Sequence, residues 1–594
     1  MTNSETAKSR VWFFPTSPRS PYKLKAELEL LKSVSHLPWS RDKGQLKFAE
    51  LLRQDPTYEG SASAADPTFP ARDRTRGPKM LGLIDVTGSG SNSVLRLTEA
   101  GEKLLTLTDF EEQTLFLNQV AKVQFPSRQH KSRDFLAMNC RPLAITLEIL
   151  LQVGSITKEE FGLFVISTTR PEQVPSSVES LKEFRRKISL AAPGLARKEL
   201  RSQLVDEHIS KIYAEDIAKG NTLLREGGTN FIKTKRQTVT GDYADSSFRY
   251  LLATGLFKID RHGKTFSILE SKRELSKSLV SELGLGSNYL NYQDDEYVDS
   301  YLGTLAEPST TLFSLASQTA ALEELLREND THQSENNALL AEFKTLKNGV
   351  DRELFYLSVE KEKREGIILE RAVELVRNRE ASSIEITDFF DEITSRNSDL
   401  IDKPLFLEWN TWRAMTVLND ALQVTGNFRT DTDGNPIGTA AGRQPDILVE
   451  YSDFWLAVEV TLTSGAKQYE AESESITRHV GQLQANLISE GDVRPIFGLF
   501  IAPKVNETVV NYLLVNSRMN SRAYKGPVKI VPLELERFKS LVDINKHLEI
   551  TSSRKLKETL DQMFELPTAV TGDEQGWLED TGSHLGELSL EPVS

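Results

Sequence analysis

The chain has 594 residues, of which 39% are hydrophobic and 27% are charged. This length exceeds what one hydrophobic core normally supports, so we expect about two to four domains. No run of about 18 apolar residues indicates a membrane span, and the polar start of the sequence lacks the apolar core of a signal peptide. The single cysteine, Cys140, excludes an intrachain disulfide and a thiolate metal cluster. We therefore expect a cytoplasmic protein with no membrane partner.

The charge is distributed unevenly along the chain. The formal net charge is −14, yet residues 1–290 contain 43 Lys and Arg against 34 Asp and Glu, a net charge of +9. The remaining residues carry a net charge of −23, and no Lys or Arg follows Lys557. A basic amino-terminal half favours a polyanionic partner such as nucleic acid. The acidic end predicts a mobile, solubilising tail at residues 566–594.

One pattern occurs twice in the amino-terminal half. Residues 79–101 and 249–269 each contain a helix end, a glycine, a short apolar strand, a tight loop and a second strand. This order is the outline of a winged helix, in which the helix before the hairpin commonly enters the major groove of DNA. We therefore expect a DNA-recognition region in residues 1–300, with two winged-helix-like subdomains at about 20–150 and 151–300.

Two clusters of basic side chains accompany this pattern. The first has an arginine at every second position from 72 to 76 and a lysine at 79, although Gly77-Pro78 would interrupt a continuous helix. Guanidinium groups suit guanine edges and phosphate oxygens. A solvated surface position is the more common alternative for any one such residue. The candidate DNA contacts in the two clusters are Arg72, Arg74, Arg76, Lys79, Arg128, His130 and Lys131.

Residues 301–385 have long polar helical patterns, with few Gly or Pro between 312 and 380. They predict a helical linker that holds two functional halves at a set distance. A coiled-coil dimer is the weaker alternative, because no regular heptad lasts long enough.

The most informative segment is a predicted hairpin whose strands, 447–451 and 454–461, are separated by Ser452-Asp453 alone. If these two residues form its loop, Asp446 lies opposite Glu459, with Cβ atoms roughly 5 Å apart. Two carboxylates at that distance repel unless a cation lies between them, and Mg²⁺ suits such oxygen ligands. Ser-Asp is an unfavoured hairpin loop, so a register slipped by one residue is the alternative.

Predicted helices on either side of this hairpin carry further candidate residues. Residues 404–415 predict a helix that places Glu408 on the same face as Trp412 and Met415. Residues 467–488 predict a second helix, in which Glu472 and His479 share a face. The alternatives are a rim carboxylate at 408 with its head in solvent and a solvated Glu-His pair on a charged face.

Several segments carry a resemblance to a known family. In the carboxy-terminal half they are 439–446 (Thr-Ala-Ala-Gly-Arg-Gln-Pro-Asp), 458–461 (Val-Glu-Val-Thr) and 472–479 (Glu-Ser-Glu-Ser-Ile-Thr-Arg-His). In the amino-terminal half they are 17–21, 72–74, 81–83, 95–101 and 124–131. They are similar to the AlwI-type family of type IIS restriction and nicking endonucleases, and the helix, acidic hairpin and helix resemble the PD-(D/E)xK nuclease core. The likeness covers nearly the whole chain.

The resemblance implies a multidomain α+β fold in which the winged-helix half recognises double-stranded DNA and an α/β PD-(D/E)xK-like domain at residues 386–565 cleaves it. It implies Asp446 and Glu459 as ligands of Mg²⁺ and adds Arg19 to the DNA contacts. The catalytic residues that it implies are Asp446, Glu459, Glu408, Glu472 and His479. The expected reaction is the hydrolysis of one strand, or nicking, at a fixed offset from an asymmetric site in a prokaryotic restriction-modification system. Second-strand cleavage then needs a second copy or a separate small nuclease subunit, and the resemblance favours the subunit.

The sequence departs from the general nuclease pattern at Thr461, where a lysine is usual two residues after the second acid. Thr461 cannot polarise the attacking water as a lysine would, so this role passes to the metal, to His479 or to Lys467. The alternative function is a sequence-specific DNA-binding protein with an inactive nuclease fold.

Overall fold

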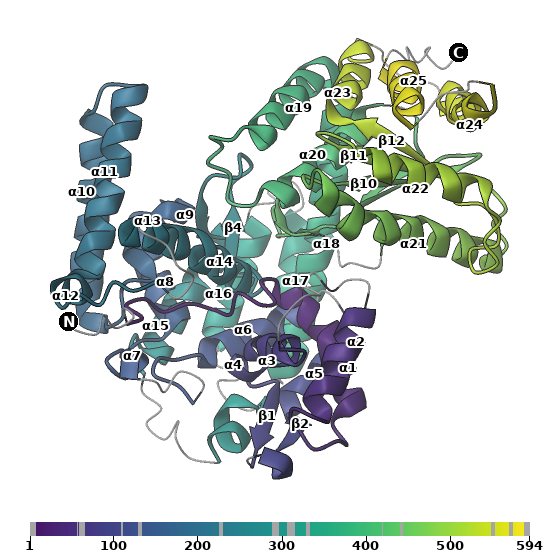
Figure 1. Ribbon diagram of the computed structural model, residues 1–594. Coiled ribbons are helices and arrows are strands. Elements are labelled where there is room, and N and C mark those ends of the chain that lie inside the picture. The colour runs from purple at the N-terminus through teal and green to yellow at the C-terminus, as the bar shows by residue number, and fades with distance from the viewer. Residues whose placement is uncertain are drawn as a thin grey trace. The chain divides into compact units, whose positions relative to one another are not determined.

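The computed structural model describes residues 8–55, 58, 66–88, 90–108, 111–128, 133–224, 230–287, 296–305, 315–327, 333–347, 349–418, 420–439, 444–547, 553–569 and 574–586. The chain divides into an amino-terminal unit of residues 1–53 and 62–362 and a carboxy-terminal unit of residues 54–61 and 363–594 (Figure 1). The division falls inside α18 (Gly349–Arg377), within the predicted linker. Helices and strands occur in both units, so the multidomain α+β expectation is confirmed. No helix of the described residues is long and apolar enough to cross a membrane.

The first repeat has the predicted order of elements. Its helices α3 (Phe69–Arg74) and α4 (Arg76–Met80) precede an antiparallel hairpin of β1 (Ile84–Thr87) and β2 (Val94–Leu97). Gly82 between helix and hairpin has a φ of +66°, which favours glycine. A Cβ at Gly101 would lie 2.0 Å from the carbonyl oxygen of Leu83, so the helix after the hairpin packs too closely for any side chain there. The other helices here are α1 (Leu24–Val34), α2 (Gly44–Gln54), α5 (Glu99–Thr106), α6 (Glu112–Lys122) and α7 (Arg133–Leu136).

The second repeat also has the predicted order. Helix α14 (Ala244–Leu252) leads through Gly255, with a φ of +67°, to β4 (Phe257–Ile259) and β5 (Phe266–Ile268). Asp260 Oδ1 accepts hydrogen bonds of 2.7 Å from the backbone N–H groups of Lys264 and Thr265, which explains the tight loop. A third strand, β3 (Ser155–Ile156), pairs with β5, so the sheet order is β3-β5-β4. The winged-helix class of both repeats stays a prediction.

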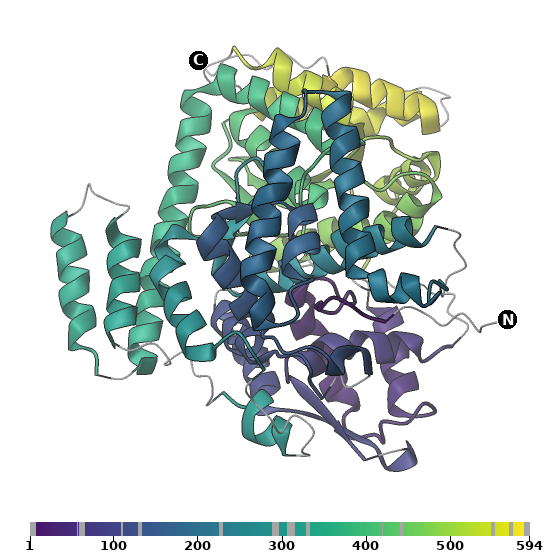
Figure 2. The ribbon, with the colours of Figure 1, turned by 90° about the vertical axis from the view of Figure 1, so that its left-hand side faces the viewer.

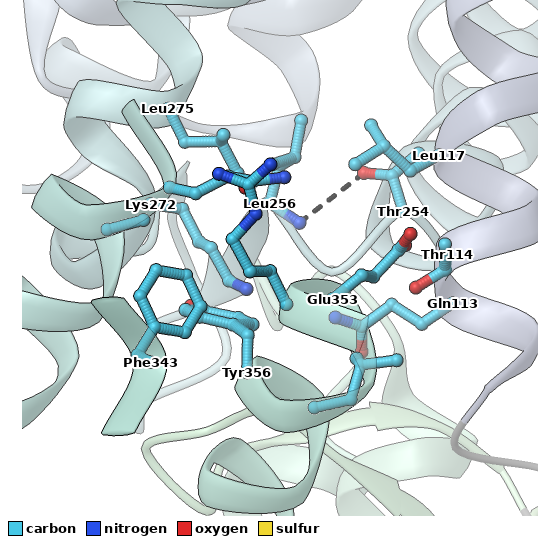
Figure 3. Close-up of a pocket in the computed structure, with 14 residues that line it drawn as sticks. Gln113, Thr114, Leu117, Thr254, Leu256, Lys272, Leu275, Phe343, Glu353 and Tyr356 are labelled. Atoms are coloured by element: carbon cyan, nitrogen blue, oxygen red, sulfur yellow. Dashed lines mark hydrogen bonds between the residues drawn. The ribbon is translucent and has the colours of Figure 1, made fainter. Parts of the chain in front are cut away.

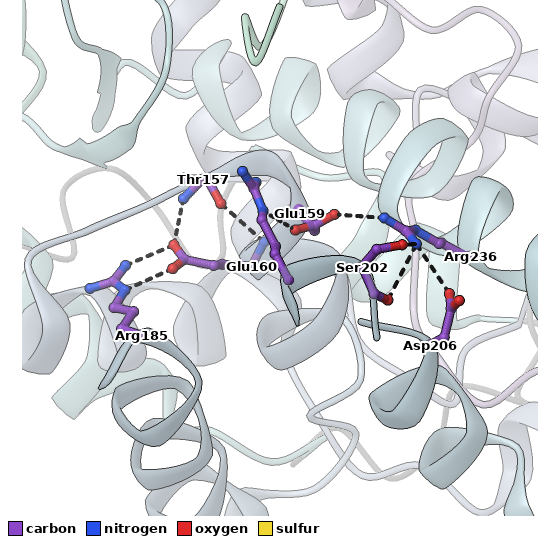
Figure 4. Close-up of polar contacts among 8 residues, drawn as sticks. Thr157, Glu159, Glu160, Arg185, Ser202, Asp206 and Arg236 are labelled. Carbon is purple, nitrogen blue, oxygen red and sulfur yellow. Dashed lines mark hydrogen bonds and ion pairs between the residues drawn. The ribbon is translucent and has the colours of Figure 1, made fainter. Parts of the chain in front are cut away.

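Between β3 and α14 the chain forms a long helical hairpin. Helices α10 (Val174–Leu190) and α11 (Leu195–Ile212) lie side by side in both views (Figures 1 and 2). Glu160 binds Arg185 of α10 through both carboxylate oxygens (Figure 4). Glu159 pairs with Arg201 of α11 at 2.7 Å. Ion pairs therefore anchor the base of the hairpin. The neighbouring helices are α8 (Pro142–Val153), α9 (Lys158–Glu160), α12 (Ala214–Ala218), α13 (Phe231–Arg236) and α15 (Arg273–Leu283).

The predicted linker is helical, and its first part packs within the amino-terminal unit. Its helices there are α16 (Leu315–Arg327), α17 (Gln333–Thr345) and the start of α18. Leu322, Leu325 and Phe343 form a small core between them. Lys272 Nζ makes a buried ion pair of 2.7 Å with Glu360 and lies over the ring of Tyr356. A cavity of about 70 Å³, lined in part by Lys272 and Tyr356, remains here (Figure 3). The first part of the predicted linker therefore belongs to a packed domain. An extended spacer would not have such a buried core and ion pair.

The carboxy-terminal unit contains a five-stranded sheet of order β12-β11-β10-β9-β6. Its parallel strands β10, β11 and β12 are connected through helices, as parallel strands require, and β11 is buried along its whole length. The strands of this unit are β6 (Gln423–Gly426), β7 (Arg429–Thr430), β8 (Pro436–Gly438), β9 (Ile447–Glu450), β10 (Trp455–Val460), β11 (Ile496–Ala502) and β12 (Ile530–Glu534). The helices are α19 (Arg379–Thr394), α20 (Lys403–Leu418), α21 (Ala466–Glu490), α22 (Glu507–Arg518), α23 (Leu535–Ile544), α24 (Ser553–Ala569) and α25 (Glu574–Gly586).

Part of the segment expected to be a mobile tail is folded instead. Helix α25 contacts β12, α22 and α23, and its side chains Trp577 and Leu578 are buried in a hydrophobic core of this unit. Trp577 Nε1 also donates a hydrogen bond of 3.1 Å to the carbonyl oxygen of Met563. The prediction of a mobile segment rested on the acidic composition and was wrong for this helix. Burial of Trp577 and Leu578 is enough to hold a short helix against the core. The end of the predicted tail, 587–594, lies outside the described residues.

Candidate active site

The hairpin of β9 and β10 has the predicted register. Trp455 pairs with Glu450 and Val458 with Ile447, while Tyr451 N donates a hydrogen bond of 3.0 Å to the carbonyl oxygen of Phe454. The rings of Tyr451 and Phe454 stack with centroids 4.2 Å apart. This stacking stabilises the hairpin with Ser452-Asp453 as its loop. The alternative register, slipped by one residue, is not the one that forms.

The next position along this register holds the acidic pair, Asp446 and Glu459. Asp446 Oδ2 accepts a hydrogen bond of 2.8 Å from the backbone N–H of Val460, so its carboxylate reaches across to the end of β10. Asn427 donates a hydrogen bond from its backbone N–H to the carbonyl oxygen of Asp446 at 2.9 Å and one from Nδ2 to that of Pro445 at 2.6 Å. The backbone that carries Asp446 is thus held on both sides.

Helix α21 contributes two more of the predicted side chains. His479 Nδ1 lies 2.7 Å from Glu459 Oε1, and Thr461 Oγ1 donates a hydrogen bond of 2.7 Å to Glu472 Oε1. Glu459 and Thr461 are two residues apart along an extended chain, which explains why both face the same helix. Glu459, His479 and Thr461 are each at most 9% exposed. The structure therefore brings together the acidic pair, Glu472 and His479 at one end of the sheet.

The electrostatics of this end of the sheet disfavour three free carboxylates. Burial, followed by the charge of Glu459, raises the pKa of Asp446 well above its ordinary value; the Val460 hydrogen bond opposes this shift, and Glu472 adds to it. Burial and then Glu472 raise the pKa of Glu459, while Arg478 opposes the shift. A cation or a shared proton would relieve this repulsion.

The acidic pair suits a hard divalent cation, although it does not form a complete cage. No group of three or more His, Cys, Asp or Glu side chains in the described residues is arranged to hold a metal. Mg²⁺ is usually bound by one or two carboxylates, with water and substrate phosphate completing its shell. Two crowded carboxylates with raised pKa values have the donor chemistry that such an ion requires. Asp446 and Glu459 thus fit a site in which two carboxylates bind one divalent cation.

Glu408 and Lys467 were the other candidates near this site. Glu408 is buried on α20, a helix that packs against β9 and β10, and its catalytic role stays a prediction. On the same helix, Trp412 Nε1 donates a hydrogen bond of 3.1 Å to the carbonyl oxygen of Val424. Lys467 is exposed in the first turn of α21 and has no described contact with the acidic pair. The lysine substitute considered from the sequence is therefore not in place in this conformation.

The neighbouring residue, Gln468, has a role that the sequence did not indicate. Its side chain is completely buried and donates hydrogen bonds to the carbonyl oxygens of Thr463 and Lys504, at 2.8 and 2.9 Å. Its Oε1 accepts a hydrogen bond of 2.7 Å from the backbone N–H of Asn506. Gln468 thus ties the start of α21 to the loops after β10 and β11. A glutamine in a charged helix gives no local signal of this role.

The predicted DNA contacts lie in different environments. Arg76 is exposed and pairs with Asp73 at 3.1 Å, and Arg72 pairs with Asp66. Arg19 is half-exposed and pairs with Asp242 at 2.6 Å. Burial lowers the pKa of the Lys79 ammonium, an effect that Asp85 opposes and Arg76 reinforces. Arg128 is half-buried, and His130 and Lys131 lie outside the described residues.

Arg74 is a correction to the list of DNA contacts. Its side chain is buried and pairs with Glu27 of α1 at 2.8 Å. The helical register turns Arg74 inward while Arg72 and Arg76, two residues away on either side, remain at the surface. Arg74 therefore joins two helices, and its guanidinium is not available to a base edge.

The chain matches a known family of DNA-cleaving enzymes over most of its length. The model of the AlwI restriction endonuclease family matches residues 79–541, which is most of the chain. The chain is thus a restriction endonuclease, a DNA-cleaving hydrolase. It belongs to the AlwI restriction endonuclease family.

Two solved structures are also similar to this chain. The crystal structure of the small subunit (R.BspD6I2) of the heterodimeric restriction endonuclease R.BspD6I is 26% identical, covering 35% of this chain and 99% of that chain with a TM-score of 0.28. The structure of restriction endonuclease FokI is 12% identical, covering 84% of each chain with a TM-score of 0.21. The comparison with curated proteins found no match.

Proposed function

We propose that this chain is a type IIS endonuclease that hydrolyses one DNA strand at a fixed offset from an asymmetric recognition site. The observation that carries the proposal is the buried acidic pair, held opposite each other by the register of β9 and β10, with His479 bonded to Glu459. Two carboxylates that repel each other at the end of a sheet destabilise the fold. Such a pair is more often found at a functional site than in a purely structural position.

Asp446 and Glu459 would hold the divalent metal ion, which we propose to be Mg²⁺. When bound, the ion supplies an activated water and stabilises negative charge on the phosphoryl group. The protein positions the two ligands: Val460 N orients Asp446, and His479 orients Glu459. Thr461 keeps Glu472 beside them without adding a positive charge. His479 is the remaining candidate to accept or donate a proton, because Lys467 is exposed and has no described contact with the pair.

The amino-terminal unit would recognise the duplex. Its two helix-glycine-hairpin repeats provide elements of a suitable size for the major groove, and Arg72, Arg76 and Lys79 lie directly before the first hairpin. We propose these three residues and Arg19 as the first set of contacts to test. Of the remaining predicted contacts, Arg128, His130 and Lys131 stay candidates.

One nuclease site cuts one strand, so cleavage of both strands requires a second site. We propose that a separate small nuclease subunit supplies it, as in the heterodimeric enzyme whose small subunit was among the solved structures. We place the complex in the bacterial cytoplasm, where a restriction enzyme meets foreign DNA.

A plasmid assay tests this proposal. Supercoiled plasmid is incubated with the purified chain and Mg²⁺, and wild type is compared with Asp446→Ala and with Asp453→Ala, whose acid is exposed in the hairpin loop. We expect open-circular product from the wild type and from Asp453→Ala, and none from Asp446→Ala. Linear product would indicate cleavage by two copies. An Asp446→Ala variant that cuts as well as wild type would remove the proposed site.

A second function has one observation in its favour, the threonine at position 461. Without a lysine there, the chain could bind DNA specifically and leave the backbone intact. Unchanged plasmid on several sequences, together with a specific footprint in the same buffer, would support this binding-only function.

A further inference from the structure

Arg379, at the start of α19, is a buried arginine without a described partner. Its side chain is only 7% exposed, and its Nε and Nη1 have no hydrogen-bond acceptor among the described residues. Burying a charged group is unfavourable unless it is paired, because the group loses its water. Burial accordingly lowers the pKa of the Arg379 guanidinium, and no acid opposes the shift. Few buried polar groups in native folds lack a hydrogen-bond partner, and a bound ligand or ion is one way in which such a group is completed.

The other buried lysines and arginines of the described residues have hydrogen-bond acceptors. Arg141 donates to the carbonyl oxygens of Ala121 and Gly286, at 3.3 and 3.2 Å, and three further cations pair with carboxylates. Arg74 pairs with Glu27 at 2.8 Å, and Lys272 pairs with Glu360 at 2.7 Å. In the carboxy-terminal unit itself, Arg413 pairs with Glu385 at 2.9 Å. Arg379 differs from them because its Nε and Nη1 have no acceptor among the described residues, which leaves these two donors available to a ligand.

Arg379 lines an open pocket whose volume is about 660 Å³. The pocket lies between the junction of α18 and α19 and the residues after α23, and its other charged lining residues are Arg377, Glu380, Lys546 and His547. Glu380 lies 3.7 Å from His547, and Lys546 pairs with Asp543 at 2.8 Å. These contacts balance part of the charge. The exposed Arg377 and the buried Arg379 leave the pocket with a basic excess.

We propose that this pocket binds a phosphate group of the duplex DNA backbone, with Arg379 as the central donor. A planar guanidinium matches two phosphate oxygens, and an open pocket of about 660 Å³ is large enough for a phosphate group. A restriction endonuclease must hold a polyanion with one negative charge on every backbone phosphate, so DNA is the anion that the family membership already supplies. The contact would be independent of base sequence, and it would hold the duplex on the unit that carries the candidate active site.

The salt dependence of DNA binding tests this role. Binding of the full-length chain to a short duplex is measured from low to moderate salt, with a chelator present so that no strand is cut. Arg379→Met is expected to bind about tenfold more weakly at low salt and to lower the slope of log Kd against log salt by about 0.9, on specific and unrelated sequences alike. Arg396→Met is the matched control, because Arg396 is an exposed arginine beyond the other end of α19. It should retain the wild-type slope.

A thermal unfolding measurement distinguishes DNA binding from a structural role of Arg379 and from the binding of a free anion. In phosphate-free buffer, Arg379→Met should unfold at the same temperature as wild type or higher, because it removes an unpaired buried charge. A lower unfolding temperature with an unchanged salt slope would assign Arg379 a structural role and overturn the proposal. Stabilisation by inorganic phosphate that depends on Arg379, again with an unchanged slope, would assign the pocket to a free anion and overturn the DNA assignment. Because binding is measured without cleavage, these results do not depend on the acidic pair.

Discussion

Thr461 Oγ1 donates a hydrogen bond of 2.7 Å to Glu472 Oε1, which joins the end of β10 to α21 at the candidate active site. The position where the resemblance to the PD-(D/E)xK core predicts a lysine thus holds a neutral donor that is hydrogen-bonded to an acid. A lysine would have neutralised one charge beside the acidic pair. Threonine adds no positive charge beside Asp446, Glu459 and Glu472, so none of these acids is neutralised by a neighbouring lysine when a cation binds.

The role of Thr461 can be tested by removing its hydroxyl. Thr461→Val keeps the shape of the side chain and leaves Glu472 without this donor, so we expect nicking to slow by about tenfold, the kinetic equivalent of one hydrogen bond. Thr461→Ser should retain most of the activity. The nicking rate is measured under single-turnover conditions, and equal rates for the valine and serine variants would show that the hydroxyl has no part in cleavage.

Neutralising the acidic pair should separate stability from activity. We expect Asp446→Asn to lose about 10³-fold in nicking rate, because the variant lacks one of the two proposed metal ligands. The same variant should be as stable as wild type or more stable in a chelator, since the repulsion from Glu459 is gone. Calorimetry without divalent ions measures this. A large loss of stability would instead mean that the Asp446 carboxylate supports the fold through Val460.

The raised pKa values predict a pH dependence of stability. The folded protein holds protons on Asp446 and Glu459 at pH values where the unfolded chain, with carboxyl pKa values of about 4, has released them. Fewer protons on the unfolded state mean that the free energy of unfolding falls as pH rises from about 4 through the raised pKa values. Chemical denaturation in a chelator should show this decline for wild type and a smaller one for Asp446→Asn. At neutral pH, added Mg²⁺ should restore the stability that wild type loses relative to Asp446→Asn. If the stability of wild type still declines with pH when Mg²⁺ is present, the metal assignment is contradicted.

Gln468 should support the site without contacting DNA. Gln468→Ala removes three hydrogen bonds and leaves the carbonyl oxygens of Thr463 and Lys504 unpaired, so we expect a loss of about 2 kcal/mol in the free energy of unfolding and slower nicking. DNA affinity in a chelator should stay within a factor of about two of wild type, a margin of roughly experimental error. The exposed neighbour supplies the control, because Lys467→Ala should change neither stability nor rate.

Two arginines on adjacent helices should give opposite results. Arg74→Met breaks a buried ion pair and should cost about 3 kcal/mol of stability. Arg76→Met should leave stability unchanged and weaken DNA binding by about tenfold, because Arg76 is exposed before the first hairpin. Denaturation and a binding isotherm measure the two effects. If Arg76→Met binds DNA as wild type does, the first basic cluster is not part of the recognition surface.

The short-range features of this chain were predictable from its sequence. The register of β9 and β10 follows from two apolar strands and a two-residue loop, and each repeat of helix, glycine and hairpin follows from local spacing. These features depend on residues close together in the chain, where backbone geometry leaves few alternatives. The family likeness was equally local in origin, since it rested on short motifs.

Only the tertiary structure decided which neighbouring side chains are buried and paired and which are exposed. Arg74 is buried against α1 while Arg76 is exposed, Gln468 is buried beside the exposed Lys467, and Trp577 anchors a segment whose charge suggested a mobile tail. Each outcome depends on a partner far away in the sequence, such as Glu27 for Arg74 or Asn506 for Gln468. Burial and pairing arise only when elements that are distant in the sequence pack together. The spacing along the chain could therefore identify candidate residues, but it could not assign their roles.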